Sequence, residues 1–267
     1  GFSSAGQVLI AQDVGAKRMD AVQKTIGTMF TFLLSVSAAI AVVCYLLRAS
    51  LLTWLNTPAA AREYAMDYLV TCVCGLVFIY GYNIVSAILR GMGDSKRPFL
   101  FIAIAAILNM VLDVLFVKYL HMEVFGAALA TVIGQGVSFL ASLVYLYRRR
   151  ESFGFDFKLR SFALDREAMS KLCALGIPMA IQSAAINISK IVLTSWINLY
   201  GVVFSALSGL YNKINMMIGI VSQSFTTAGS SMVGQNLGAK KHDRVPKIMK
   251  VVLRMWSVIT RTLTSVL

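Results

Sequence analysis

The sequence has 267 residues, of which 58% are hydrophobic and only 14% are charged, and its formal net charge is +13. Soluble globular domains carry about 25% charged residues, so this composition excludes an ordinary soluble domain. The basic residues gather in alternate loops and not on one face, so the net charge does not indicate a nucleic-acid-binding protein.

Long apolar segments follow one another along the chain, each close to the roughly 20 residues that a helix needs to cross a bilayer. The period-two alternation of membrane β-strands is absent. The sequence therefore predicts an all-α, multi-pass protein of the inner (plasma) membrane. We expect one span to end near residue 15, further spans near 25–47, 66–89, 98–118, 124–147, 171–200 and 203–237, and another to begin at 247.

The distribution of Lys and Arg predicts how these spans are oriented. Nineteen basic residues lie in one set of loops, and three lie in the intervening set. Because cytoplasmic loops are enriched in Lys and Arg, we expect the first set to be cytoplasmic. It includes the longest polar connection, 148–170, where Asp165 is expected to cap a short amphipathic helix that leads into the next span.

A repeat links the two ends of the chain. Residues 1–27 align without gaps on residues 224–250, and ten of the 27 positions are identical. Six spans lie between the copies, so we expect parallel repeats and a two-lobed transporter with a substrate cleft between the lobes. The chain opens without an initiator Met or a basic signal region and ends inside an apolar stretch, so we expect a piece of a longer protein.

Five motifs follow one another along the chain: LRGMGDSKRP at 89–98, LNMVLDVLFV at 108–117, FGAALATVIGQ at 125–135, GIP at 176–178 and AGSSMVGQNLGAKKHDR at 228–244. In sequence and in order they resemble motifs of the multidrug and toxic compound extrusion (MATE) family. The resemblance implies twelve helices in two six-helix lobes, which exchange protons or sodium for organic, often cationic compounds. It places this chain from the second helix into the ninth.

On this pattern the chain has three parts. We expect residues 1–147 to form an N-terminal lobe that lacks its first helix. Residues 148–170 would be a cytoplasmic linker, and residues 171–267 the first part of a C-terminal lobe.

Asp113 is the clearest ionisable residue inside a predicted span, where a charge costs about 2.5–3.5 kcal/mol on insertion scales. Counting about 1.5 Å per residue, Asp113 and Thr131 lie at one depth, and Asn109 and Gln135 lie together at a greater depth. The resemblance implies that Asn109, Asp113 and Thr131 form a cation or proton site, with sodium as the candidate metal. The family completes this site with an Asp from its first helix. The alternative is that Asp113 is a hydrogen-bonded packing group.

Four further residues are candidates to line the cleft: Gln135, Lys190, Lys213 and Met216. The two lysines lie inside predicted spans, and flexible Met side chains suit the binding of varied ligands. The alternative for each is a packing or lipid-facing role.

These observations predict a secondary active antiporter and not an enzyme. We expect a proton or sodium as coupling ion, no cofactor, small-molecule substrates and the lipid bilayer as partners, no nucleic acid, and a monomer. A lipid-linked oligosaccharide flippase of related architecture is the first alternative. A channel or membrane scaffold, which needs no coupling carboxylate, is the second.

Overall fold

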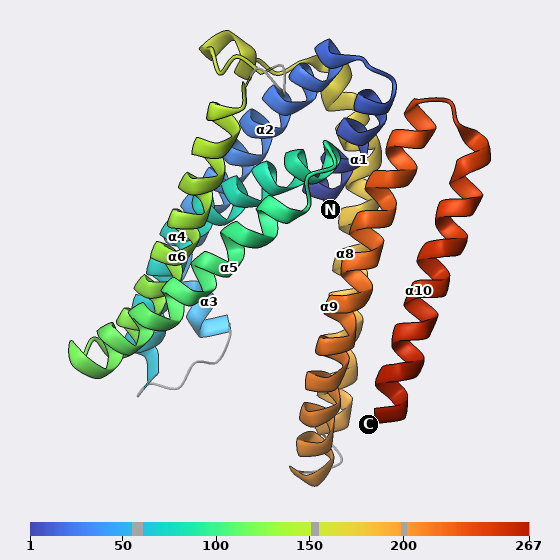
Figure 1. Cartoon of the computed structure of the whole chain (residues 1–267). Helices are drawn as coiled ribbons and strands as arrows, with labels where there is room; N and C mark the ends of the chain where they lie inside the picture. Colours follow the sequence, from blue (N-terminus) through green and yellow to red (C-terminus); the bar gives the residue numbers. More distant parts are fainter. Residues whose placement is uncertain (55–60, 151–154, 199–201, 267) are drawn as a thin grey trace. The chain divides into compact units, whose positions relative to one another are not determined.

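The computed structural model describes residues 1–54, 61–150, 155–198 and 202–266, and their regular structure is helical throughout (Figure 1). The chain divides into two compact units. Unit 1 comprises Gly1–Arg18, Arg90–Gly93 and Ser170–Leu267, and unit 2 comprises Met19–Leu89 and Asp94–Met169.

Unit 2 contains a helical hairpin, α5 and α6, in which the two helices pack along one another (green in Figure 1). Its core includes the last turns of α4, where Ile84, Val85 and Ile88 are fully buried. The elements of this unit are α2 (Met19–Leu46), α3 (Arg48–Trp54), most of α4 (Arg62–Gly91), α5 (Lys96–Asp113), the π-helix η2 (Val114–Tyr119), α6 (Glu123–Arg148) and the 3-10 turn η3 (Leu159–Phe162).

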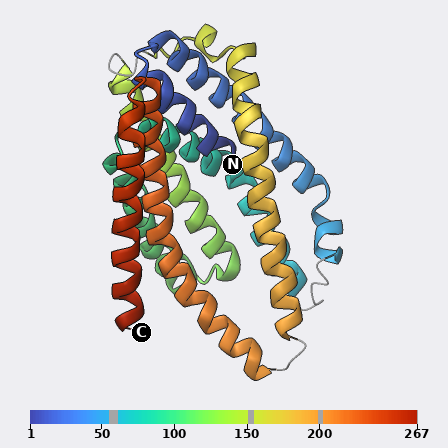
Figure 2. The ribbon, with the colours of Figure 1, turned by 90° about the vertical axis from the view of Figure 1, so that its right-hand side faces the viewer.

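Unit 1 is built around α9, which packs against both α1 and α10. The pairing of α9 with α10, orange and red, is visible in both views (Figures 1 and 2). The elements are α1 (Phe2–Gly15), most of α8 (Arg166–Asn198), α9 (Val202–Gly238), the 3-10 turn η4 (His242–Arg244) and α10 (Val245–Val266). Helix α1 thus packs with helices of the predicted C-terminal lobe, and the lobe boundaries at 147 and 171 stay a prediction.

Five described helical segments are long and apolar enough to cross a membrane: α2, α4, α5 with η2, α6 and α8. The most apolar stretch of α5 with η2 has a mean hydropathy of 2.6, yet only 6% of it is buried. Its Phe99, Ile107 and Val111 side chains are 68%, 59% and 59% exposed. A surface of this kind suits lipid and not water, so the prediction of a multi-pass membrane protein is confirmed.

The predicted spans at 203–237 and from 247 onward are helices α9 and α10, but they are not among these five. The second half of α9 is rich in polar side chains, which lower its hydropathy. Some of them face α1, where the buried Gln7 donates from Nε2 to the Thr227 carbonyl at 3.1 Å and to Ser231 Oγ at 2.8 Å. Ser231, one of these polar residues, therefore takes part in a helix–helix contact.

The predicted linker, 148–170, packs onto α2 through residues 155–170. An aromatic cluster of Phe155, Phe157 and Phe162 reaches the Phe30 ring, whose centroid lies 5.7 Å from that of Phe162. Thr31 Oγ1 also donates to the Phe162 carbonyl. The linker is thus held to α2 by packing and by a hydrogen bond. Residues 151–154 lie outside the described part.

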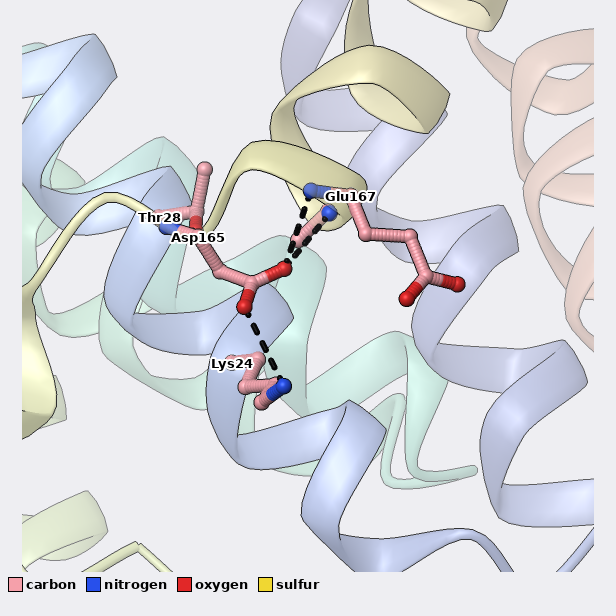
Figure 3. Close-up of polar contacts among 5 residues, drawn as sticks. Lys24, Thr28, Asp165 and Glu167 are labelled. Atoms are coloured by element: carbon pink, nitrogen blue, oxygen red, sulfur yellow. Dashed lines mark hydrogen bonds and ion pairs between the residues drawn. The ribbon is translucent and has the colours of Figure 1, made fainter.

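Asp165 fixes the end of the linker (Figure 3). Its Oδ1 accepts the backbone N–H groups of Glu167 at 3.1 Å and Ala168 at 2.9 Å, which is the geometry of a helix N-cap. Its Oδ2 lies 3.2 Å from Lys24 Nζ on α2, and its own N–H donates to Thr28 Oγ1 at 3.1 Å. The pKa of Asp165 is held below its usual value, mainly by the backbone hydrogen bond from Ala168 and next by the hydrogen bond from Lys24.

The predicted N-cap at Asp165 is confirmed, but the separate short amphipathic helix is wrong. Helix α8 runs without a break from Arg166 to Asn198, with Pro178 inside it. Neighbouring groups can satisfy the backbone that a proline frees in a membrane helix, so the GIP motif at 176–178 does not end the helix.

Asp165→Ala is expected to loosen the linker more than Lys24→Gln, because it removes both the helix cap and the ion pair. Asp165→Asn keeps a good capping residue and loses only the charge, so its Tm should match that of Lys24→Gln. A carboxyl with a lowered pKa stabilises the folded state at neutral pH and loses that effect as the pH falls below about 4. Thermal unfolding between about pH 2 and pH 7 should therefore show a Tm difference between the parent and Asp165→Asn that shrinks as the pH falls below about 4. A constant difference across this range would contradict the role of the ion pair.

Candidate functional site

The α5–α6 hairpin is closed by small residues on α6. A methyl group added at Gly134 would lie 3.1 Å from the Ala105 carbonyl oxygen and 3.4 Å from Asn109 Cβ. Near the tip of the hairpin, a methyl group at Gly126 would lie 2.9 Å from Phe116 Cβ. Both glycines are buried. The two backbones approach closely because α6 has no side chain at these positions.

The hairpin brings three of the predicted polar residues together. Asn109 Nδ2 on α5 donates to Thr131 Oγ1 on α6 at 3.3 Å, and Thr131 Oγ1 in turn donates to the Ala127 carbonyl at 3.0 Å. Both residues line a pocket of about 160 Å³, and Gln135 lines it one turn further along α6. An amide, a hydroxyl and a second amide therefore surround one small cavity at membrane depth.

Asp113 lies where α5 changes from α-helix to π-helix. Its Oδ1 is buried, and among the described residues it has no hydrogen-bond partner. A buried carboxylate oxygen without a partner is costly, and such a group calls for a specific explanation. π-Helical turns are rare and frequently occur at functional sites. Asp113 follows Asn109 by four residues, which places both on one side of α5.

The pairing between the helices differs by about one turn from the depth estimate, which matched Asn109 with Gln135 and Asp113 with Thr131. In the structure Asn109 pairs with Thr131. The estimate assumed an α-helix through residue 117, whereas Val114–Tyr119 is wound as a π-helix with more residues per turn. The hairpin tip is therefore shorter than the count implied, and Asp113 lies nearer to the tip.

The other predicted cleft residues lie in unit 1. Lys190 on α8 lines a pocket of about 470 Å³ with Thr194, Ser195 and Asn212. Lys213 and Met216 on α9 are exposed. The cleft that these residues were predicted to share stays a prediction.

Two features of the structure were not predicted from the sequence, one at the α5–α6 site and one at the junction of α1 with α9. One is the π-helix after Asp113, for which the sequence of Val114–Tyr119 carries no distinct signal. The other is Gln7. Its Oε1 accepts a hydrogen bond from Arg90 Nε at 3.1 Å, and its Nε2 donates to Ser231 on α9. A glutamine inside the apolar run of α1 was the available signal for this junction.

Comparison with known proteins gives consistent results. The sequence model of the MatE family matches residues 1–115 and 178–267. The probable multidrug resistance proteins YpnP and YoeA of Bacillus subtilis are 31% and 28% identical to the chain over 92% and 94% of its length. The chain spans little more than half of these relatives, 54% and 55%.

The fold matches solved transporters over nearly the whole chain. A MOP superfamily transporter from Pyrococcus furiosus superposes with a TM-score of 0.89 at 24% identity, covering 96% of this chain and 56% of that one. A MATE protein in complex with MaD3S superposes with a TM-score of 0.90 at 23% identity, covering 96% and 57%. Family model, relatives and fold agree: this all-α, multi-pass membrane chain belongs to the MatE family.

Proposed function

We propose that this chain carries the ion-coupling half of a secondary antiporter, which exports organic, often cationic compounds in exchange for protons or sodium. The single observation that supports this most is Asp113, a carboxylate at an α-to-π junction within a membrane-spanning segment. One of its oxygens is buried and has no hydrogen-bond partner among the residues that the structure describes. A packing group would be expected to hold a hydrogen bond there. A group that takes up and releases a cation needs an open ligand position.

Polar residues of the same hairpin suit a hard cation or a proton, although Asp113 does not line the pocket that Asn109 and Thr131 share. Sodium, like other hard cations, prefers oxygen ligands, which the Asp113 carboxylate, the Asn109 amide and the Thr131 hydroxyl can supply. The hydrogen bond from Asn109 to Thr131 sets the orientation of both side chains before any ion arrives. The expected contribution of Asn109 and Thr131 is therefore positioning, while Asp113 supplies the charge that changes on binding.

The energy for export would come from the coupling ion. One elementary charge that moves down a potential of 100 mV releases about 2.3 kcal/mol. By mass action this corresponds to about a 50-fold substrate gradient, so no nucleotide is needed. For such exchange, ion binding must favour one conformation and substrate binding the other.

Transport by the purified protein, in the length that its host makes, tests this proposal. Vesicles that contain the protein should expel a fluorescent cationic drug when a proton or sodium gradient is imposed, and should stop when the gradient is collapsed. Drug transport that does not depend on any ion gradient would contradict antiport. Movement of a labelled lipid-linked oligosaccharide without drug movement would establish the flippase alternative, which the multidrug relatives do not favour.

The orientation is tested by cysteine labelling. In a background without the four native cysteines, Ala163→Cys places a thiol on an exposed linker position that is predicted to be cytoplasmic. An impermeant thiol reagent should label it only after cells are opened. Leu120→Cys, at the exposed tip between η2 and α6, is the matched control and should be labelled in intact cells. Labelling of Ala163→Cys in intact cells would overturn the predicted topology.

A further inference from the structure

Helices α1 and α9 end in the same way, at corresponding positions of the sequence repeat. In α1, the N–H of Lys17 donates to the Val14 carbonyl at 3.0 Å and the N–H of Arg18 donates to the Asp13 carbonyl at 2.9 Å. In α9, the N–H groups of Lys240 and Lys241 make the equivalent bonds, to Leu237 at 3.0 Å and to Asn236 at 2.9 Å. Each helix therefore ends in a Schellman motif.

The two ends are held against each other by a reciprocal contact. A methyl group added at Gly15 would overlap the carbonyl oxygen of Gln235, and one added at Gly238 would overlap that of Gln12. Gly15 corresponds to Gly238 in the repeat, and Gln12 corresponds to Gln235. The same contact is thus made twice, which relates the two helix ends by a local pseudo-two-fold axis.

Beside this crossing lies a pocket of about 820 Å³ with basic side chains from both helix ends. Its lining includes Lys17 and Arg18 from the end of α1 and Lys240 and Lys241 from the end of α9. Arg18 is neutralised by Asp13, whose Oδ1 lies 2.7 Å from Arg18 Nη2. The three lysines have no ion pair in the part of the chain that the structure describes. The pocket therefore attracts anions from two sides.

The backbone at two of these lysines gives independent support. Lys17 and Lys240 have φ values of +58° and +56°, in the left-handed region that glycine adopts most easily. Glycine is the usual residue at this position of a Schellman motif. Lysine stands at this position in both copies, although glycine adopts this backbone more easily, so each helix end keeps a basic side chain at the pocket.

We propose that this pocket binds an anionic phospholipid headgroup that carries two phosphates, as in a cardiolipin. The distribution of basic residues predicts that this end of α1 and α9 is cytoplasmic, where the leaflet is rich in anionic lipids. Basic pockets between membrane helices on this side bind such headgroups. Two phosphates match a site with a lysine from each of two helix ends related by a pseudo-two-fold axis. The proposal is independent of the ion site at Asp113.

The test uses the purified, delipidated protein, in the length that its host makes, and measures lipid binding by native mass spectrometry or in nanodiscs. Cardiolipin should bind more tightly than phosphatidylglycerol, and phosphatidylcholine should not compete. The double variant Lys17→Gly/Lys240→Gly removes both charges and relaxes the backbone, so its Tm should be unchanged or higher. Its cardiolipin affinity should fall by about 30-fold, the effect expected for two lysines near a membrane surface.

Two further variants distinguish binding in the pocket from nonspecific attraction by the protein's positive charge. Lys241→Gln leaves the left-handed positions untouched and should also weaken cardiolipin binding. Lys247→Gln/Lys250→Gln removes two charges from α10, outside the pocket, and should bind as the parent does. Unchanged binding by Lys17→Gly/Lys240→Gly, or an equal loss in the α10 control, would overturn the proposal. Equal affinity for inorganic phosphate or soluble glycerol bisphosphate would overturn the lipid as the source of the anion.

Discussion

Gly238→Ala is expected to lower the Tm of the protein more than any other single methyl addition on α9. The added methyl group would overlap the Gln12 carbonyl oxygen and lie 2.7 Å from the Gln12 carbonyl carbon. Both atoms belong to the α1 backbone, which cannot rotate away as a side chain can, so the helices must separate. Overpacking of this kind costs about 3 kcal/mol. Thermal unfolding in detergent, followed by intrinsic fluorescence, measures the loss.

A control on the same helix makes this prediction specific. A methyl group at Gly219 meets nothing within 4 Å among the described residues, so Gly219→Ala should leave the Tm unchanged or raise it slightly. Gly15→Ala adds the corresponding methyl group from α1, against Gln235, and should cost about as much as Gly238→Ala. If Gly238→Ala behaves like Gly219→Ala, the close crossing is wrong. Unequal losses at Gly15 and Gly238 would argue against the pseudo-two-fold axis.

Asp113→Asn is expected to abolish ion-driven export while the protein still folds. Asparagine keeps the size and most of the hydrogen-bonding capacity of the side chain, but it cannot carry the charge that balances a cation. Drug efflux from vesicles should therefore fall to the level of vesicles without protein. Drug binding should stay measurable, because the candidate drug cleft does not depend on this charge. Expression level and Tm, measured alongside, should stay near the parent values.

Substitutions at Asn109 and Thr131 should impair export less than Asp113→Asn does. Asn109→Ala and Thr131→Ala each remove one partner of a single neutral hydrogen bond and one oxygen ligand. Each should weaken the apparent affinity for the coupling ion by about fivefold without abolishing export. If Asp113→Asn exports as well as the parent across the pH range, in both sodium and potassium, Asp113 is a packing residue.

Several features of the fold could be predicted from local patterns in the sequence. Five of the predicted spans are long apolar helices, and the small residues of α6 do bring it close to α5. The N-cap at Asp165 was also predictable, since a capping residue before a helical run is a local signal. The repeat indicated that the ends of α1 and α9 correspond, and the structure shows the two ends in reciprocal contact.

Other features depend on packing between distant segments, which a local pattern does not encode. The change to a π-helix after Asp113 moved the pairing of Asn109 by about one turn, and its residues have ordinary helical propensities. The left-handed backbone at Lys17 and Lys240 could not be predicted either, because glycine is the residue that marks such a position. The polar residues of α9 are visible in the sequence, but the contact of Ser231 with Gln7 on α1 needed the structure.

Reversed exchange is the most direct test of coupling at Asp113. Vesicles that contain the protein, in the length that its host makes, are prepared with no ion gradient and are then given a steep gradient of a cationic drug. Drug movement in one direction should drive protons or sodium in the other, recorded with a pH-sensitive or sodium-sensitive dye inside the vesicles. The account predicts this counterflow in the parent and its absence in Asp113→Asn. Equal counterflow in both proteins, or drug movement without any ion flux in the parent, would contradict it.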